Sequence, residues 1–156
     1  MISNFTDLPE EDLSLFLDAL PLITVYIAGV DGKIKEGELN WAEKLIKIRQ
    51  FDFPSALNTY YEMVDDRISD RIDELRKELP GDHEKRREII EERLSKLNPI
   101  LGELETHTAN NFVASFRSFA KHVARASGGI FGFGSISEKE ARIMKLEMFT
   151  PIKGQL

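Results

Sequence analysis

Cysteine is absent from this chain of 156 residues, and its 27 acidic residues outnumber its 21 lysines and arginines. Without cysteine the protein can form neither disulfides nor thiolate metal sites, which fits a reducing compartment. The net charge of −6 disfavours sequence-independent binding to nucleic acid, because phosphates attract basic surfaces. We therefore expect a cytoplasmic protein that does not bind nucleic acid.

Long hydrophobic runs are also missing. The most apolar stretch, residues 13–30, is interrupted by Asp18 and Pro21 and ends after 18 residues, whereas a membrane-spanning helix needs roughly 20 mostly apolar residues. The first residues are acidic, whereas a signal peptide begins with basic ones. We interpret the stretch as part of the core and expect no transmembrane segment.

Catalytic motifs are equally scarce. The three histidines, His83, His107 and His122, belong to no HExxH motif, and none follows a glutamate by three residues as in di-iron bundles. No serine lies in a G-x-S-x-G setting, and the glycine-rich residues 128–134 lack the Lys-Ser/Thr pair of a phosphate loop. We predict that the protein is not an enzyme, although a hydrolase whose site has no familiar motif stays a third hypothesis.

Helical periodicity dominates what is present. Apolar residues three and four apart predict helices over 54–79, 90–104 and 109–126, and Ser137 is a plausible N-cap for a last helix over 137–148. The stripes that carry these predictions are Val64, Ile68, Ile72, Leu75 and Leu79; Ile90, Leu94, Leu97, Leu101 and Leu104; and Phe112, Phe116, Phe119, Ala120 and Val123. Pro99 interrupts the second stripe, so it either kinks the helix or opens a new one capped by Asn98.

The short Pro80-Gly81-Asp82 break makes residues 54–104 a long helical hairpin, since short connections join antiparallel neighbours. Its other faces carry 12 acidic and 8 basic residues between positions 62 and 93, which is typical of a solvated surface. We predict one all-α domain over residues 1–156, a globular bundle of six or seven helices with two pseudo-symmetric halves joined by this hairpin.

The segment VDGKIKEGE, residues 30–38, resembles the second half of an EF-hand loop. With Gly32 at the sixth position, Asp31 is fifth and Glu38 is twelfth, but Ile27 and Gly29 occupy the first and third ligand positions. An ordinary EF-hand is therefore excluded. The same residues also suit a turn without metal, because acids such as Glu38 favour the first turn of a helix.

A similar segment occurs 102 residues later in the sequence. Gly134, Ile136 and Glu140 repeat Gly32, Ile34 and Glu38, while Phe133 stands where Asp31 would be. Each copy follows an apolar helix and precedes a charged one. The matching positions of these residues predict an internal duplication of a helix–turn–helix unit, in which the second copy binds metal more weakly or not at all.

Residues 27–32, followed by Ile34 and Glu38, resemble the TerB-like family, which is named for tellurite-resistance proteins. The resemblance covers about residues 13–50 and 109–148. It implies an all-helical fold of two similar halves and a calcium-like divalent cation held by Asp31, Glu38 and Glu140, with Ser127 or Ser135 as neutral donors. It also implies a stress-response role beside a protein partner, often at membranes, as a binding or sensing module.

Two functions follow as expectations. The first is a non-enzymatic TerB-like module that binds a divalent cation weakly at Asp31 and Glu38. The alternative is a metal-free scaffold that presents the charged hairpin, or the Gly-Phe loop of residues 128–134, to another protein.

Overall fold

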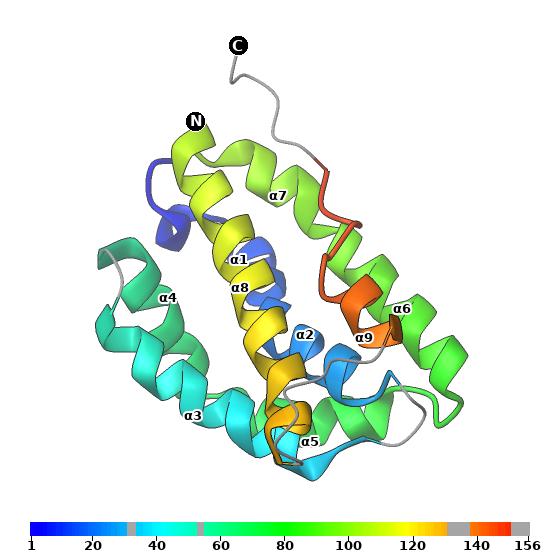
Figure 1. The fold of residues 1–156 in the computed structure, drawn as a ribbon. Coiled ribbons are helices and arrows are strands. Elements are labelled where there is room, and N and C mark those ends of the chain that lie inside the picture. Colours follow the sequence, from blue (N-terminus) through cyan, green and yellow to red (C-terminus); the bar gives the residue numbers. More distant parts are fainter. Residues whose placement is uncertain (31–33, 53–54, 131–137, 151–156) are drawn as a thin grey trace.

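The computed structural model describes residues 1–30, 34–52, 55–130 and 138–150. Their regular structure is helical, which confirms the predicted all-α fold class, and they form a single globular fold (Figure 1). In chain order the elements are η1 (Phe5–Asp7), α1 (Glu10–Leu17), α2 (Ala19–Ala28), α3 (Glu36–Asp52), α4 (Ser55–Asp65), α5 (Ile68–Glu78), α6 (His83–Ser95), α7 (Leu97–Glu103), α8 (Thr106–Ile130) and α9 (Glu138–Ile143).

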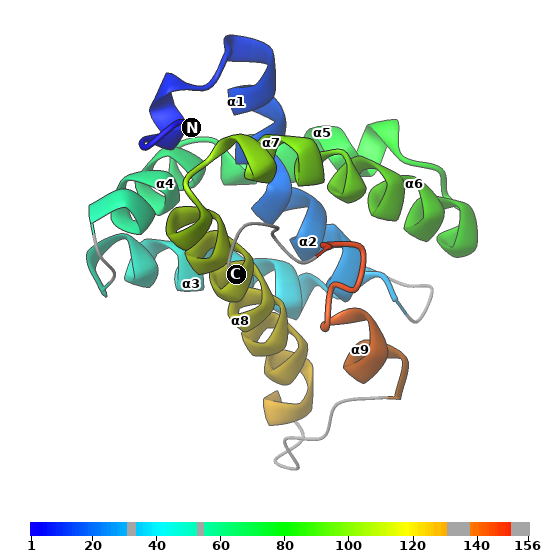
Figure 2. The same ribbon diagram turned by 90° about the horizontal axis from the view of Figure 1, so that it is seen from above.

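Helix α2 is the centre of the fold. All ten of its residues are buried, and it contacts α3, α5, α6 and α8, which surround it in Figures 1 and 2. A helix that is apolar on every side can only be stable when it is covered on every side. This confirms the core position for residues 16–30, whereas Leu13 and Leu15 are half-buried and Ser14 is exposed. Within the described ranges, no helix is long and apolar enough to cross a bilayer.

Aromatic side chains fill the core beside α1 and α2. Phe5, Phe16, Tyr60, Phe112 and Phe116 pack mostly edge to face, with ring centroids 4.9 to 6.1 Å apart. The Tyr60 hydroxyl donates to the Phe16 carbonyl oxygen at 2.6 Å, so the polar atom of this buried ring has a partner. The cluster ties the N-terminal segment to α4 and α8.

The prediction of one helix over residues 54–79 is wrong. The chain leaves α4 at Asp65 and begins α5 at Ile68, so α4 packs against α3 while α5 packs against α2. The break also directs Arg67 and Arg71 toward the Asp18 carboxylate, at 3.2 and 2.9 Å. The apolar stripe itself is buried as predicted.

The second arm of the predicted hairpin is also divided. Helix α6 ends at Ser95 and α7 begins at Leu97, two residues before Pro99, so a new helix does open near the proline. Asn98 does not cap it. Its side-chain amide donates to the Met148 carbonyl oxygen at 2.9 Å, and its Oδ1 accepts from the Thr150 N–H at 3.1 Å. Asn98 thus fastens the C-terminal segment, residues 138–150, to α7.

The C-terminal part follows the prediction only in part. Helix α8 buries its predicted stripe, but it continues to Ile130, so Gly128 and Gly129 lie in a helix and not in a loop. The rest of the Gly-Phe loop and Ser137 are outside the described residues. Helix α9 ends at Ile143, five residues earlier than predicted, because the chain turns at Leu146, whose φ is 49°, and so buries both Leu146 and Phe149.

Candidate functional site

The predicted metal-binding residues are only partly visible. Glu38 lies in the first turn of α3, and its side chain is 1% exposed, with one oxygen 3.6 Å from the Lys35 ammonium. Asp31 is outside the described residues. Glu140 lies in α9, but its side chain is outside the described part, as are Ser127 and Ser135.

The turn between α2 and α3 is closed by backbone contacts. The Lys35 N–H donates to the Ala28 carbonyl oxygen at 3.0 Å, and Ile34 packs against the core as expected. Gly29 accepts a hydrogen bond at its carbonyl oxygen from Arg86 Nη2, at 3.0 Å. A Cβ on Gly29 would lie 2.8 Å from that nitrogen, so any side chain here would have to displace the buried guanidinium.

These contacts give a divalent cation little to bind. Among the described residues, no three histidine, aspartate or glutamate side chains come together, whereas calcium takes six to eight oxygen ligands. The one carboxylate in place, Glu38, already faces a lysine ammonium. The described donors by themselves therefore do not make up a cation site.

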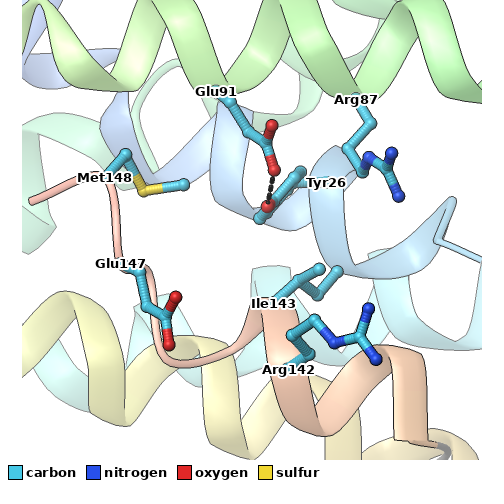
Figure 3. Close-up of a pocket in the computed structure, with 7 residues that line it drawn as sticks. All are labelled: Tyr26, Arg87, Glu91, Arg142, Ile143, Glu147 and Met148. Atoms are coloured by element: carbon cyan, nitrogen blue, oxygen red, sulfur yellow. Dashed lines mark hydrogen bonds between the residues drawn. The ribbon is translucent and has the colours of Figure 1, made fainter.

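A pocket of about 400 Å3 opens between α2, α6 and the C-terminal segment (Figure 3). Four of its seven lining residues are charged, one is a tyrosine and two are apolar: Arg87, Glu91, Arg142, Glu147, Tyr26, Ile143 and Met148. Convergent polar groups in a concave site of this size are typical of small-molecule binding.

Tyr26 and Glu91 form the inner wall of the pocket. The Tyr26 hydroxyl donates to Glu91 Oε2 at 2.5 Å, a short bond of the kind that phenols make to carboxylates. Tyr26 is 4% exposed. Burial, followed by the bond to Glu91, raises the pKa of Tyr26 far above its ordinary value, so the hydroxyl stays protonated and acts as a donor.

The two arginines of the pocket lack side-chain partners among the described residues. Arg87 precedes Glu91 by one helical turn, a spacing at which the two could pair, but Glu91 is turned toward Tyr26 instead (Figure 3). Within the described part of the chain, neither Arg87 nor Arg142 makes a side-chain hydrogen bond or an ion pair. The pocket therefore offers two guanidinium groups that are available to a ligand.

The charged surface of α5 and α6 behaves differently. Arg71 is held by Asp18, Glu74 and Glu78, and Glu78 is also 3.4 Å from Arg93. The Arg71 and Arg93 guanidinium groups also lower the pKa of Glu78. These groups neutralise one another, as on a solvated helical face, so no observation here favours a protein partner at this surface.

Sequence reasoning missed the pocket entirely. Its residues come from three segments of the chain, and Tyr26 and Glu91 are 65 positions apart. One signal was available: Tyr26 carries the only phenol within an otherwise apolar helix, and a buried tyrosine hydroxyl usually requires a partner. No pattern in the sequence identifies that partner.

No protein-family model, curated protein or solved structure matches this chain. The TerB-like resemblance therefore rests on the residues of the turn and of the similar later segment alone.

Proposed function

We propose that this protein is a non-enzymatic binding module for a small molecule that bears an anionic group, and that the ligand occupies the pocket between α2, α6 and the C-terminal segment. One observation carries the proposal: Arg87 and Arg142 line a pocket of about 400 Å3 without a side-chain partner among the described residues. Guanidinium groups bind carboxylates and phosphates through charge-assisted hydrogen bonds.

The chemistry of Tyr26 favours binding over catalysis. A phenol whose pKa is raised by burial is a poor general acid or base near neutral pH, but it is a good fixed donor. Its bond holds Glu91 in place, so the wall of the pocket is organised before a ligand arrives.

Calorimetric titration with pentanoate, a simple carboxylate probe, tests the proposal. We expect weak, saturable binding that Arg87→Gln and Arg142→Gln each reduce roughly threefold to tenfold. Arg125→Gln is the matched control, because Arg125 is an exposed arginine of α8 that does not line the pocket. Equal binding by all four proteins, or no binding by any, would refute the proposal.

The cation site implied by the TerB-like resemblance remains a second candidate, in keeping with a stress-related role. Its one favourable observation is the almost complete burial of the Glu38 carboxylate beside the turn. A calcium titration followed by amide NMR tests it. Shifts over residues 30–38 that disappear in Asp31→Asn and Glu38→Gln, but not in Glu36→Gln, would support the site. Unchanged spectra would leave Glu38 as an ion pair with Lys35.

A further inference from the structure

The charges of the pocket are arranged in two groups. Along α6, Arg87 and Glu91 are four residues apart, which separates them by about 6 Å along the helix axis. Across the pocket, the C-terminal segment repeats the order with Arg142 and Glu147. Figure 3 shows both arginines toward one side of the pocket and Glu147, with Met148, at the other. We name Arg87 with Arg142 the basic end, and Glu91 with Glu147 the acidic end.

The two ends suit opposite charges on one ligand. The four charged side chains sum to zero, so a ligand with a net charge would leave one end unsatisfied. At the acidic end, Glu91 uses Oε2 for the Tyr26 hydroxyl, and its Oε1 makes no hydrogen bond within the described ranges. Glu147 is exposed and has no side-chain partner among the described residues either. Both carboxylates can therefore accept hydrogen bonds from a cationic group.

The pocket also has apolar lining residues. Ile143 is buried and Met148 is half-buried, and both line the pocket. A chain of methylene groups would pack against them and be removed from water. The pocket thus presents a basic end and an acidic end, with one apolar side chain near each (Figure 3).

We propose that the ligand is a zwitterion of the ω-amino acid class, whose carboxylate binds the basic end and whose ammonium binds the acidic end. This inference rests on the proposed function, because it requires the arginines to hold an anionic group. Because the two ends lie toward opposite sides of the pocket (Figure 3), the two charged groups of the ligand must be joined by a spacer, which the methylene chain of an ω-amino acid provides.

Three probes of matched length separate the possibilities: 5-aminopentanoate, pentanoate and pentylammonium. We expect 5-aminopentanoate to bind roughly twofold to fivefold more tightly than pentanoate, the gain of an exposed ion pair. In Glu147→Gln this advantage should shrink, because only Glu91 is left at the acidic end and the variant removes the charge of an exposed residue without touching the fold. Glu105→Gln, at an exposed glutamate outside the pocket, should behave as the wild type.

Each other outcome has a distinct meaning. If both carboxylates bind equally to the wild type and Glu147→Gln changes nothing, the zwitterion is wrong and the anion site stands. If neither carboxylate binds, or if pentylammonium alone binds, the inference and the proposed function both fail. Circular dichroism of each variant confirms that it is folded.

Discussion

Raising the pH should destabilise this protein through its tyrosines. The chain has three, Tyr26, Tyr60 and Tyr61, and all are buried. Burial raises the pKa of each above its ordinary value of 10.0, although the Arg49 guanidinium limits the rise at Tyr61. Because the folded pKa lies above the unfolded one, their contribution is fully present below about pH 10 and is lost as the pH rises further.

The magnitude follows from the unfolded state, where each phenol ionises near pH 10. At about pH 11, ionisation favours the unfolded chain by about 1.4 kcal/mol for each tyrosine that stays neutral in the folded state. Tyr26 and Tyr60 together therefore remove about 3 kcal/mol, and Tyr61 adds a smaller amount in the same direction. A domain of this size has only about 5–15 kcal/mol to lose.

Two measurements test this expectation. Urea unfolding, followed by circular dichroism between about pH 8 and 11, should give a free energy of unfolding that falls by about 1.4 kcal/mol per pH unit for each neutral tyrosine above pH 10. Tyr26→Phe should reduce that slope by one tyrosine. Phenolate absorbance should rise only as helicity is lost. A tyrosine that ionises near pH 10 in the helical protein would refute the reasoning.

Three further substitutions test the contacts around the turn and the C-terminal segment. Gly29→Ala should lower the free energy of unfolding in urea by about 1.5–3 kcal/mol, because the new methyl group displaces Arg86 from its hydrogen bond. A loss below about 0.5 kcal/mol would mean that the guanidinium moves freely. Asn98→Ala should lower the free energy of unfolding by about 1–2 kcal/mol and weaken pentanoate binding, because two hydrogen bonds hold the segment that forms half of the pocket. Unchanged binding would mean that these hydrogen bonds do not position the pocket. Asp18→Asn should lower the free energy of unfolding by about 2 kcal/mol in thermal unfolding, since Arg71 then loses its most buried partner. An unchanged melting temperature would show that solvent replaces that ion pair.

The apolar stripes could be predicted because burial on one side of a helix leaves a period in the sequence. The break between α4 and α5 could not. Val64 and Ile68 keep a helical spacing across it, so periodicity alone continues the helix through Asp66 and Arg67. Tertiary contacts end α4. Helix α4 packs against α3 and α5 packs against α2, and Asp18 pairs with the arginines beside the break.

The contacts of buried charged residues could not be predicted either, because they too depend on the tertiary structure. Arg49 is 5% exposed and donates to the Tyr61 hydroxyl, to the Ser115 carbonyl oxygen and to Ser118. A charged residue on a helix is ordinarily predicted to face water, and partners as far as 73 positions away help to make its burial possible. The pocket poses the same difficulty, since its basic and acidic ends each join α6 to the C-terminal segment.

The most direct test of the ligand pocket is methyl NMR of Ile143 and Met148 during a titration with pentanoate. The account predicts that both methyl signals shift together and saturate, and that the shifts shrink in Arg87→Gln and Arg142→Gln while the Arg125→Gln spectra match the wild type. Saturable shifts elsewhere in the protein with these two methyls unmoved, or no saturable shift at all, would contradict it.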